Sequence, residues 1–262
     1  MDSTEPSDEQ RALEHEFGER VTLDGLTGSW SIYQRVRGHR HSVDDVLTAA
    51  YALEVSLPVI RHLDLGTGIG TVGLLVLWGM GAEATLTAIE AQTVSHRLLL
   101  ANIAHNQLGA RVVPLLGDLR ELELSERFPL ITGSPPYFPV SAGIVPQDSQ
   151  KAHARFELRG DVSDYALAAR RHLAPDGWFV FCFPTPQKAR ALAAVAHAGL
   201  SAVRLRDIIP RHGLGPLFSL FACRHLEAGR ACVTDAPLEV RDASGELSAA
   251  MQQVRRGFGF DV

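Results

Sequence analysis

The chain has 262 residues, of which 46% are hydrophobic and 21% are charged. These values are near the globular averages and exclude a disordered or fibrous protein. Its three cysteines, Cys182, Cys223 and Cys232, are far apart and form no C-x-x-C pair, which excludes a disulfide scaffold and a cysteine-based zinc site. The sequence has no apolar stretch long enough for a membrane span and no visible signal peptide, so we expect a cytoplasmic protein without membrane attachment.

The net charge of −5 is concentrated in the first 20 residues, which hold seven acidic and two basic side chains. We interpret residues 1–20 as an acidic, flexible tail or a frayed helix. The other 242 residues carry 23 acids and 23 bases, whereas a nucleic-acid enzyme usually displays a basic face. Contacts to phosphates would therefore come from local clusters, for which Arg35, Arg37, Arg255 and Arg256 are the candidates. His39 and His41 lack a third ligand at metal spacing, so we expect no metal.

Hydrophobic periodicity predicts a hairpin over 21–34 and a helix over 42–57, which we expect to cover the cofactor site. From residue 59 onward strands and helices alternate, as in a doubly wound α/β domain. A short polar loop precedes the last strand, which must then return antiparallel. We expect a seven-stranded, mostly parallel sheet, with residues 227–262 as an extension at its edge. The predicted strands are 60–65, 85–90, 111–116, 129–133, 178–183, 202–206 and 216–225, and the predicted helices are 70–80, 93–106, 161–173 and 187–198.

A glycine-rich turn follows the first predicted strand of the sheet, in the sequence Asp-Leu-Gly-Thr-Gly-Ile-Gly at 64–70. Its glycines Gly66, Gly68 and Gly70 allow a tight turn and close approach of a ligand to the main chain. The glycines at 68, 70 and 73 also match a dinucleotide pattern, which is weak evidence alone. The acid at position 64 distinguishes a dinucleotide site from a site for a sulfonium ligand, because it would repel a pyrophosphate and attract a sulfonium. Three acids at successive strand ends outline S-adenosylmethionine at the switch point of the sheet: Asp64, Glu90 for the ribose diol, and Asp118 for the adenine amino group.

The fourth predicted strand of the sheet runs into Ser134-Pro135-Pro136-Tyr137. Two prolines fix an extended turn, in which a main-chain carbonyl can accept a hydrogen bond from a substrate amine. Ser134 can accept the second N–H of that amine, and the ring of Tyr137 offers a flat face on which a planar substrate can stack. The corner would thus aim an exocyclic amine at an activated methyl group, with positioning as the main source of catalysis.

Together, the two motifs at 64–70 and 134–137 resemble the amino-methyltransferase branch of class I S-adenosylmethionine-dependent enzymes, which have a Rossmann-like fold. Further segments at 33–44, 101–108, 173–177 and 237–246 are similar to the bacterial valine-tRNA N6-adenine methyltransferases. The resemblance implies S-adenosylmethionine as cofactor and tRNA as partner. It also implies that Gln34, Arg40 and Asp44 line the methionine end of the cofactor. It implies two roles for Ser134: this residue contacts the cofactor, and together with Pro135, Pro136 and Tyr137 it holds the target.

One residue departs from this family pattern: Ser134 stands where the tRNA enzymes have asparagine, and a serine hydroxyl is a shorter, rotating acceptor. The leading hypothesis is methylation of N6 of adenine in tRNA. Methylation of a glutamine amide in a protein, methylation of a small molecule, and a non-catalytic cofactor-binding module are the alternatives.

Overall fold

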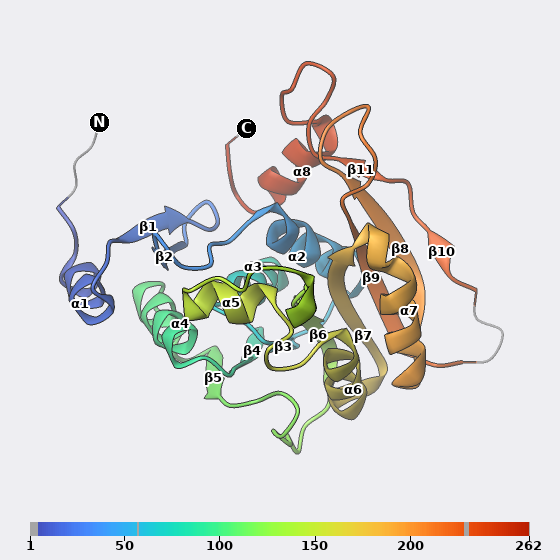
Figure 1. Cartoon of the computed structure of the whole chain (residues 1–262), viewed down its shortest axis with the longest axis horizontal. Helices are drawn as coiled ribbons and strands as arrows, with labels where there is room; N and C mark the ends of the chain where they lie inside the picture. The colour runs from blue at the N-terminus through green and yellow to red at the C-terminus, as the bar shows by residue number, and fades with distance from the viewer. Residues whose placement is uncertain (1–4, 57, 228–230, 262) are drawn as a thin grey trace.

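The computed structural model describes residues 5–56, 58–227 and 231–261. Its central feature is a twisted sheet in the order β10-β8-β9-β7-β6-β3-β4-β5, with β11 also paired to β8 (Figure 1). All neighbours are parallel except β9, which runs antiparallel to β7 and β8. The strands are β3 (Arg61–Leu65), β4 (Thr85–Glu90), β5 (Val112–Leu116), β6 (Phe128–Gly133), β7 (Leu173–Pro184), β8 (Leu200–Ile209), β9 (Phe218–His225), β10 (Val233–Thr234) and β11 (Leu238–Glu239).

The seven strands predicted from the sequence are β3 to β9, and the predicted doubly wound sheet with an antiparallel last strand is confirmed. The predicted number of strands is too low, because the C-terminal segment adds two-residue strands β10 and β11 beside β8. Strands this short lie below the length at which a periodic pattern can be recognised.

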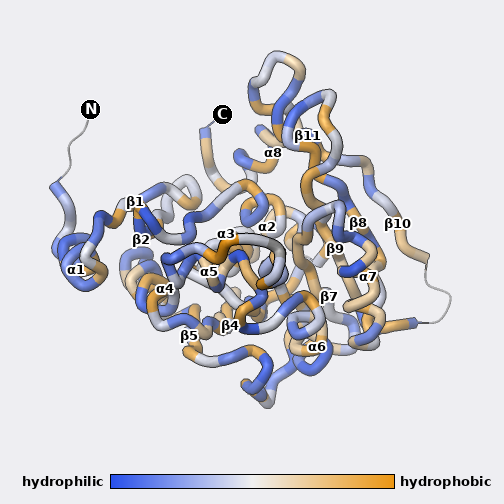
Figure 2. The backbone as a smooth tube through the Cα atoms, in the orientation of Figure 1, coloured by the Kyte–Doolittle hydropathy of each residue, from blue (hydrophilic) through white to orange (hydrophobic). Residues whose placement is uncertain are grey.

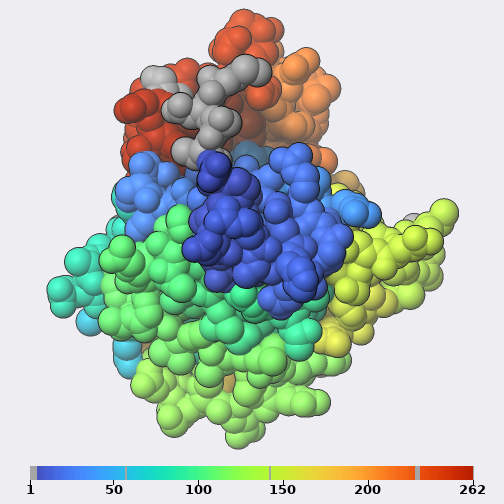
Figure 3. All heavy atoms as spheres, turned by 90° about the vertical axis from the view of Figure 1, so that its left-hand side faces the viewer, coloured from blue at the N-terminus to red at the C-terminus, as the bar shows by residue number. Residues whose placement is uncertain are grey.

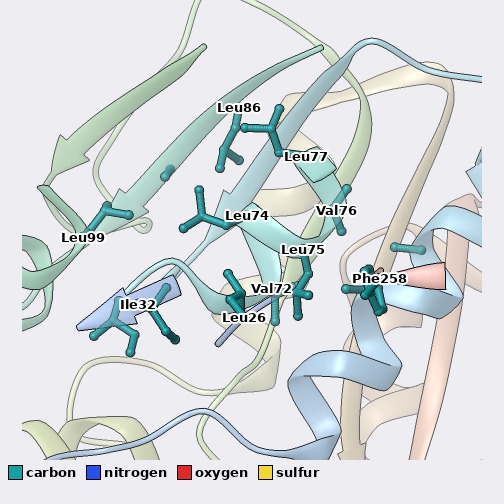
Figure 4. Close-up of a cluster of buried hydrophobic side chains, with 14 of the residues drawn as sticks. Leu26, Ile32, Val72, Leu74, Leu75, Val76, Leu77, Leu86, Leu99 and Phe258 are labelled. Carbon is teal, nitrogen blue, oxygen red and sulfur yellow. The ribbon is translucent and has the colours of Figure 1, made fainter. Parts of the chain in front are cut away.

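Helices cover both faces of the sheet (Figure 1). One hydrophobic cluster joins α2, α3 and α4 to the sheet, and a second joins α6 and α7 to the opposite face. Figure 4 shows part of the first cluster, in which Leu74, Leu75 and Phe258 lie among other apolar side chains. The helices are α1 (Asp8–Phe17), α2 (Val43–Ser56), α3 (Thr71–Met80), α4 (Thr93–His105), α5 (Ser149–Arg155), α6 (Val162–His172), α7 (Lys188–His197) and α8 (Ala249–Gly257), with short 3-10 turns η1 (Val140–Ala142) and η2 (Thr185–Gln187).

The predicted hairpin is confirmed as β1 (Val21–Gly25) and β2 (Ser31–Arg35). Two asparagines of α4 attach it to the domain. Asn102 Oδ1 accepts from the main-chain N–H of Tyr33 at 2.6 Å, and Asn106 exchanges hydrogen bonds with both main-chain groups of Ser31. These side chains pair part of the free edge of β2, which would otherwise present unsatisfied backbone groups.

Within the predicted acidic tail over 1–20, residues 8–17 form α1. Most residues of α1 are hydrophilic (Figure 2), yet Leu13 is fully buried. Acids of α1 bind a cation of the domain, because Glu9 and Glu16 both form ion pairs with Arg97. Figure 3 shows this N-terminal region, in dark blue, packed against the domain.

Residues 1–4 of the predicted tail, and Leu57 at the end of the predicted helix over 42–57, lie outside the described residues. No helix in the described part of the chain combines the length and apolarity needed to cross a membrane.

Candidate active site

The glycine turn between β3 and α3 is organised by a buried carboxylate. Asp64 accepts hydrogen bonds from Thr67 Oγ1 at 2.6 Å, Thr132 Oγ1 at 2.5 Å and the main-chain N–H of Gly73 at 3.1 Å. Burial lowers the pKa of His62 to about 3, so its neutral ring donates from Nε2 to Thr132 Oγ1 at 2.7 Å. Burial raises the pKa of Asp64 itself. This acid therefore holds the turn in place, with its hydrogen bonds made to the protein, while its carboxyl also borders the cleft.

The three predicted glycines have different roles. Gly66 and Gly68 both adopt a left-handed backbone, with φ of 60° and 61°. A Cβ at Gly66 would lie 2.0 Å from Tyr165 Oη, whereas a Cβ at Gly68 would meet no atom within 4 Å. Space is therefore open beside the main chain at Gly68, where a ligand can approach. Gly70 caps α3 and packs against Leu99, and it does not line the cleft.

Glu90, at the end of β4, connects the glycine turn to the next loop. Its Oε2 accepts from the main-chain N–H of Gly68 at 2.8 Å and its Oε1 accepts from that of Gln92 at 2.6 Å. Burial raises the pKa of Glu90. Asp118 follows β5 and is paired with Arg120, with Oδ2 and the guanidinium 2.6 Å apart. These hydrogen bonds with Arg120 lower the pKa of Asp118. Both acids line the same cleft, as the sequence predicts.

This cleft lies at the carboxyl ends of β3, β4, β5 and β6, where ligands of doubly wound sheets bind. Its volume is about 990 Å³, including the part open to solvent. Of the predicted residues, it brings together Arg40, Asp64, Gly66, Gly68, Glu90, Asp118, Ser134 and Pro136. The predicted residues that do not line it are Gln34, Asp44, Gly70, Pro135 and Tyr137.

Gln34 and Arg40 support the loop that enters α2. The side chain of Gln34 is buried, donates from Nε2 to Asp24 at 3.0 Å and accepts from the main-chain N–H of His41 at 2.8 Å. Arg40 pairs with the same Asp24 at 2.9 Å while bordering the cleft. Gln34 thus places the loop rather than lining the cleft.

Asp45, rather than the predicted Asp44, lines the cleft at the start of α2. Its Oδ2 accepts from the main-chain N–H of Ser42 at 3.0 Å, and its side chain is buried. Burial raises its pKa well above the usual value, and the neighbouring charge of Asp44 raises it further. Asp44 instead accepts from Tyr137 Oη at 3.1 Å.

The raised pKa of Asp45 predicts a pH-dependent gain in stability for Asp45→Asn. A carboxyl whose folded-state pKa is raised stabilises the fold below its unfolded value, 3.8, and this contribution is lost as the pH rises through the folded value. Near pH 3.8 and below, the free energy of unfolding of the variant should therefore match that of the wild type. As the pH rises above this value, the variant should become increasingly more stable than the wild type. Urea unfolding across the pH range tests this. Asp176→Asn, at a fully exposed side chain, is the control, and parallel profiles for Asp45→Asn and the wild type would contradict the prediction.

Ser134 to Tyr137 follow β6 as predicted, but only part of the corner faces the cleft. Ser134 and Pro136 line it, and the Ser134 hydroxyl has one weak contact, 3.8 Å to Cys182 Sγ. The predicted stacking face of Tyr137 is not in the lining. Its ring packs edge-on against Phe183, with centroids 5.6 Å apart, and its hydroxyl contacts Cys182 Sγ at 2.9 Å. Burial raises the pKa of Tyr137 well above its usual value and that of Cys182 to about 12, so both groups are protonated.

Tyr137→Phe should lower the free energy of unfolding by about 1 kcal/mol, because Asp44 loses the hydrogen bond it accepts from Tyr137 Oη. The ring contact with Phe183 is retained in this variant, so the loss comes from the hydroxyl alone. Chemical denaturation of the two proteins measures the difference, and Tyr165→Phe, at a second buried tyrosine, is the comparison. Equal stability of Tyr137→Phe and the wild type would show that the hydroxyl contributes nothing.

Sequence reasoning missed the residues that close the cleft from the side of α5. Gln150 is buried, accepts from the main-chain N–H of His39 at 3.3 Å and donates to Ser95 Oγ at 3.1 Å. It therefore links α5 to α4 and to the loop before α2 across the cleft. His153 also lines the cleft, and the described part of the chain offers its buried Nδ1 no hydrogen-bond partner. No glycine, proline or charge pattern marks these positions, because they become neighbours only in the folded chain.

Comparison with known proteins supports a methyltransferase. No family model matches the chain. The chain is 24% identical over 203 residues to the tRNA1(Val) (adenine(37)-N6)-methyltransferase of Actinobacillus pleuropneumoniae, covering 76% of this chain and 84% of that protein. It is 27% identical over 222 residues to the Shewanella baltica protein of the same name, covering 82% and 90%. A crystal structure of a predicted O-methyltransferase from Agrobacterium tumefaciens matches with a TM-score of 0.61 at 19% identity, covering 82% of this chain and 96% of that one.

The chain has the fold of the class I methyltransferases, and the curated proteins that it resembles are methyltransferases. The cleft fits S-adenosylmethionine, the cofactor predicted from the sequence, on three counts. Open space lies beside the main chain of Gly68, and Glu90 and Asp118 supply acceptors in the same cleft. Asp64, the acid that favours a sulfonium ligand over a pyrophosphate, borders the same cleft. The assignment of individual residues to parts of the cofactor stays a prediction.

Proposed function

We propose that the chain methylates N6 of adenine in a tRNA. The observation that carries this proposal is the shared cleft, in which Ser134 and Pro136 border the same space as Gly68 and Glu90. An amine held at the end of β6 would therefore lie next to the cofactor. Two relatives named as tRNA adenine-N6 methyltransferases share most of their length with the chain, which favours this substrate over the alternatives. A tRNA substrate also agrees with the cytoplasmic location predicted from the sequence.

The corner after β6 supplies acceptors for the two N–H bonds of the target amine. Among the described residues the Ser134 hydroxyl has only a weak contact, with Cys182 Sγ, so it can accept one of them. A main-chain carbonyl of the proline turn accepts the other, and Pro135 and Pro136 add no competing N–H donor. These contacts draw the nitrogen lone pair out of conjugation and direct it into the cleft. S-adenosylmethionine supplies, when bound, a methyl group activated by the sulfonium.

A base in a tRNA loop is able to leave its stack and enter such a cleft, as enzymes that act on bases require. Of the arginines predicted to contact phosphates, Arg35 is the least suited. Its side chain is 12% exposed and is held by Glu19 and by Asp148, the latter at 2.8 Å. Arg37, Arg255 and Arg256 stay proposed contacts.

Transfer of a labelled methyl group tests the function. Purified protein and labelled S-adenosylmethionine are incubated with total RNA from cells that lack the gene, and nucleosides are then separated by mass spectrometry. We expect label in N6-methyladenosine of tRNA. Label in protein would instead support the glutamine-amide alternative, and label in neither polymer would rule out RNA as the substrate. A Ser134→Ala sample controls for a contaminating methyltransferase.

A further inference from the structure

Residues 138–160, which connect β6 to α6, form a basic border along the cleft. We call them the 138–160 segment. It contains η1 and α5, and Gln150, His153, Ala154 and Arg159 of this segment line the cleft. In Figure 3 its atoms, in yellow-green, project from the edge of the molecule. The segment therefore both borders the site of methyl transfer and reaches beyond it.

Three cations of the segment form no ion pair with a carboxylate of the described residues. Within the described ranges, no carboxylate lies within 4.0 Å of Lys151, Arg155 or Arg159. The two acids of the segment are bound by cations from other elements, since Asp148 pairs with Arg35 at 2.8 Å and Glu157 pairs with Arg190 at 2.6 Å. The unpaired charge of the segment is consequently positive.

Two of the four arginines predicted to contact phosphates, Arg35 and Arg37, differ from these cations. Arg35 and Arg37 both pair with Glu19, and Arg40 pairs with Asp24 at 2.9 Å. The charge of an ion-paired arginine is already partly compensated by its carboxylate, so these residues attract a phosphate less strongly than unpaired ones. The positive charge available beside the cleft lies on the 138–160 segment instead.

Lys151 and Arg155 lie on α5, next in sequence to the cleft-lining residues Gln150 and Ala154. Burial lowers the pKa of His39, which lines the cleft, and the positive charges of Arg155 and Lys151 lower it further. Arg159 differs, because its guanidinium donates to the main-chain carbonyl of Ala91 at 2.9 Å and lies close to the acids of the cofactor site. Lys151 and Arg155 are thus the pair that an incoming polyanion meets.

An exposed aromatic ring accompanies these charges. Phe138 is 44% exposed although it follows the buried corner directly, and its ring lies 5.7 Å from that of Phe156. The backbone around it is fixed, because the main-chain N–H groups of Tyr137 and Phe138 both donate to the carbonyl of Arg155. Unpaired cations beside an exposed aromatic ring are the combination that binds single-stranded nucleic acid.

We propose that the 138–160 segment binds the RNA strand next to the target nucleotide, with Lys151 and Arg155 on its phosphates and Phe138 stacked on a neighbouring base. The inference rests on the proposed function, since it takes RNA as the substrate. It goes beyond that function by naming the surface that holds the strand. A protein substrate offers no regular row of phosphates for this pair of cations, which is why RNA is the occupant that fits.

The test measures binding and methylation separately, with valine tRNA transcribed in vitro as the probe. For Lys151→Gln/Arg155→Gln we expect about tenfold weaker tRNA binding near 0.1 M salt and a slope of log K against log salt shallower by about 1.4. The affinity for S-adenosylmethionine should stay unchanged. The matched control is Arg170→Gln/Arg211→Gln, which removes two exposed arginines outside the cleft lining and should leave the affinity for tRNA unchanged. Phe138→Leu should weaken binding several-fold without changing the slope.

A charge-conserving variant separates electrostatics from a change in shape. Lys151→Arg/Arg155→Lys should keep the salt slope of the wild type, and loss of that slope would overturn the assignment of a charge role. If the wild type methylates the tRNA while the glutamine variant binds it with unchanged affinity and slope, the inference is wrong and the proposed function stands. If the wild type labels protein and not RNA, the proposed function fails and the inference fails with it.

Discussion

Ser134→Ala is expected to lower kcat about 100-fold, the usual cost of removing one positioned hydrogen-bonding group from an active site. The hydroxyl is the side-chain acceptor for the target amine, and without it the amine keeps only its main-chain contact. Binding of S-adenosylmethionine should change by less than about twofold, since the glycine turn and Glu90 are unaffected. Single-turnover kinetics and calorimetry measure the two effects.

Two further variants make this result specific. Ser134→Asn supplies a fixed amide oxygen of the kind found in the related tRNA enzymes, and it should retain activity within about tenfold of the wild type. Ser163→Ala removes a hydroxyl at the start of α6, outside the cleft lining, and should leave kcat unchanged. If Ser134→Ala keeps the wild-type kcat, the target amine is not held by this side chain.

The fold was predictable because its signals are local. A strand of alternating or continuous apolar residues, a glycine turn with positive φ and a following helix are each encoded within about ten residues. The seven central strands and the turn at 64–70 were found for this reason. The packing of α1 on the domain was not predicted, because the contacts that hold this helix are not local. Its acids bind Arg97 on α4, more than 80 residues away.

Site residues were predictable where a main-chain motif determines their position. They were not predictable where the direction of a side chain determines whether a residue faces the cleft. Adjacent residues of a helix point about 100° apart, so the sequence does not reveal whether Asp44 or Asp45 faces the cleft. The position of Tyr137 is decided by Cys182 and Phe183 on β7, whose proximity follows from the pairing of β6 with β7. Its inward orientation therefore depends on tertiary packing, and the motif alone suggested an exposed ring.

Glu90→Ala is expected to weaken binding of S-adenosylmethionine at least about 100-fold. The carboxylate would serve the ribose hydroxyls, and it also fixes the main-chain N–H groups of Gly68 and Gln92 on either side of the cleft. Its removal therefore loses a charged acceptor and leaves two partly buried donors unpaired, and each of these losses costs about 1–3 kcal/mol. The affinity of Glu90→Gln for S-adenosylmethionine should lie between those of the wild type and Glu90→Ala, because its amide oxygen can still accept from one of the N–H groups. Calorimetric titration measures the affinities, and Glu121→Gln, at an exposed side chain outside the cleft lining, is the control. Wild-type affinity in Glu90→Ala would place the cofactor away from the end of β4 and would remove the basis for reading this cleft as its site.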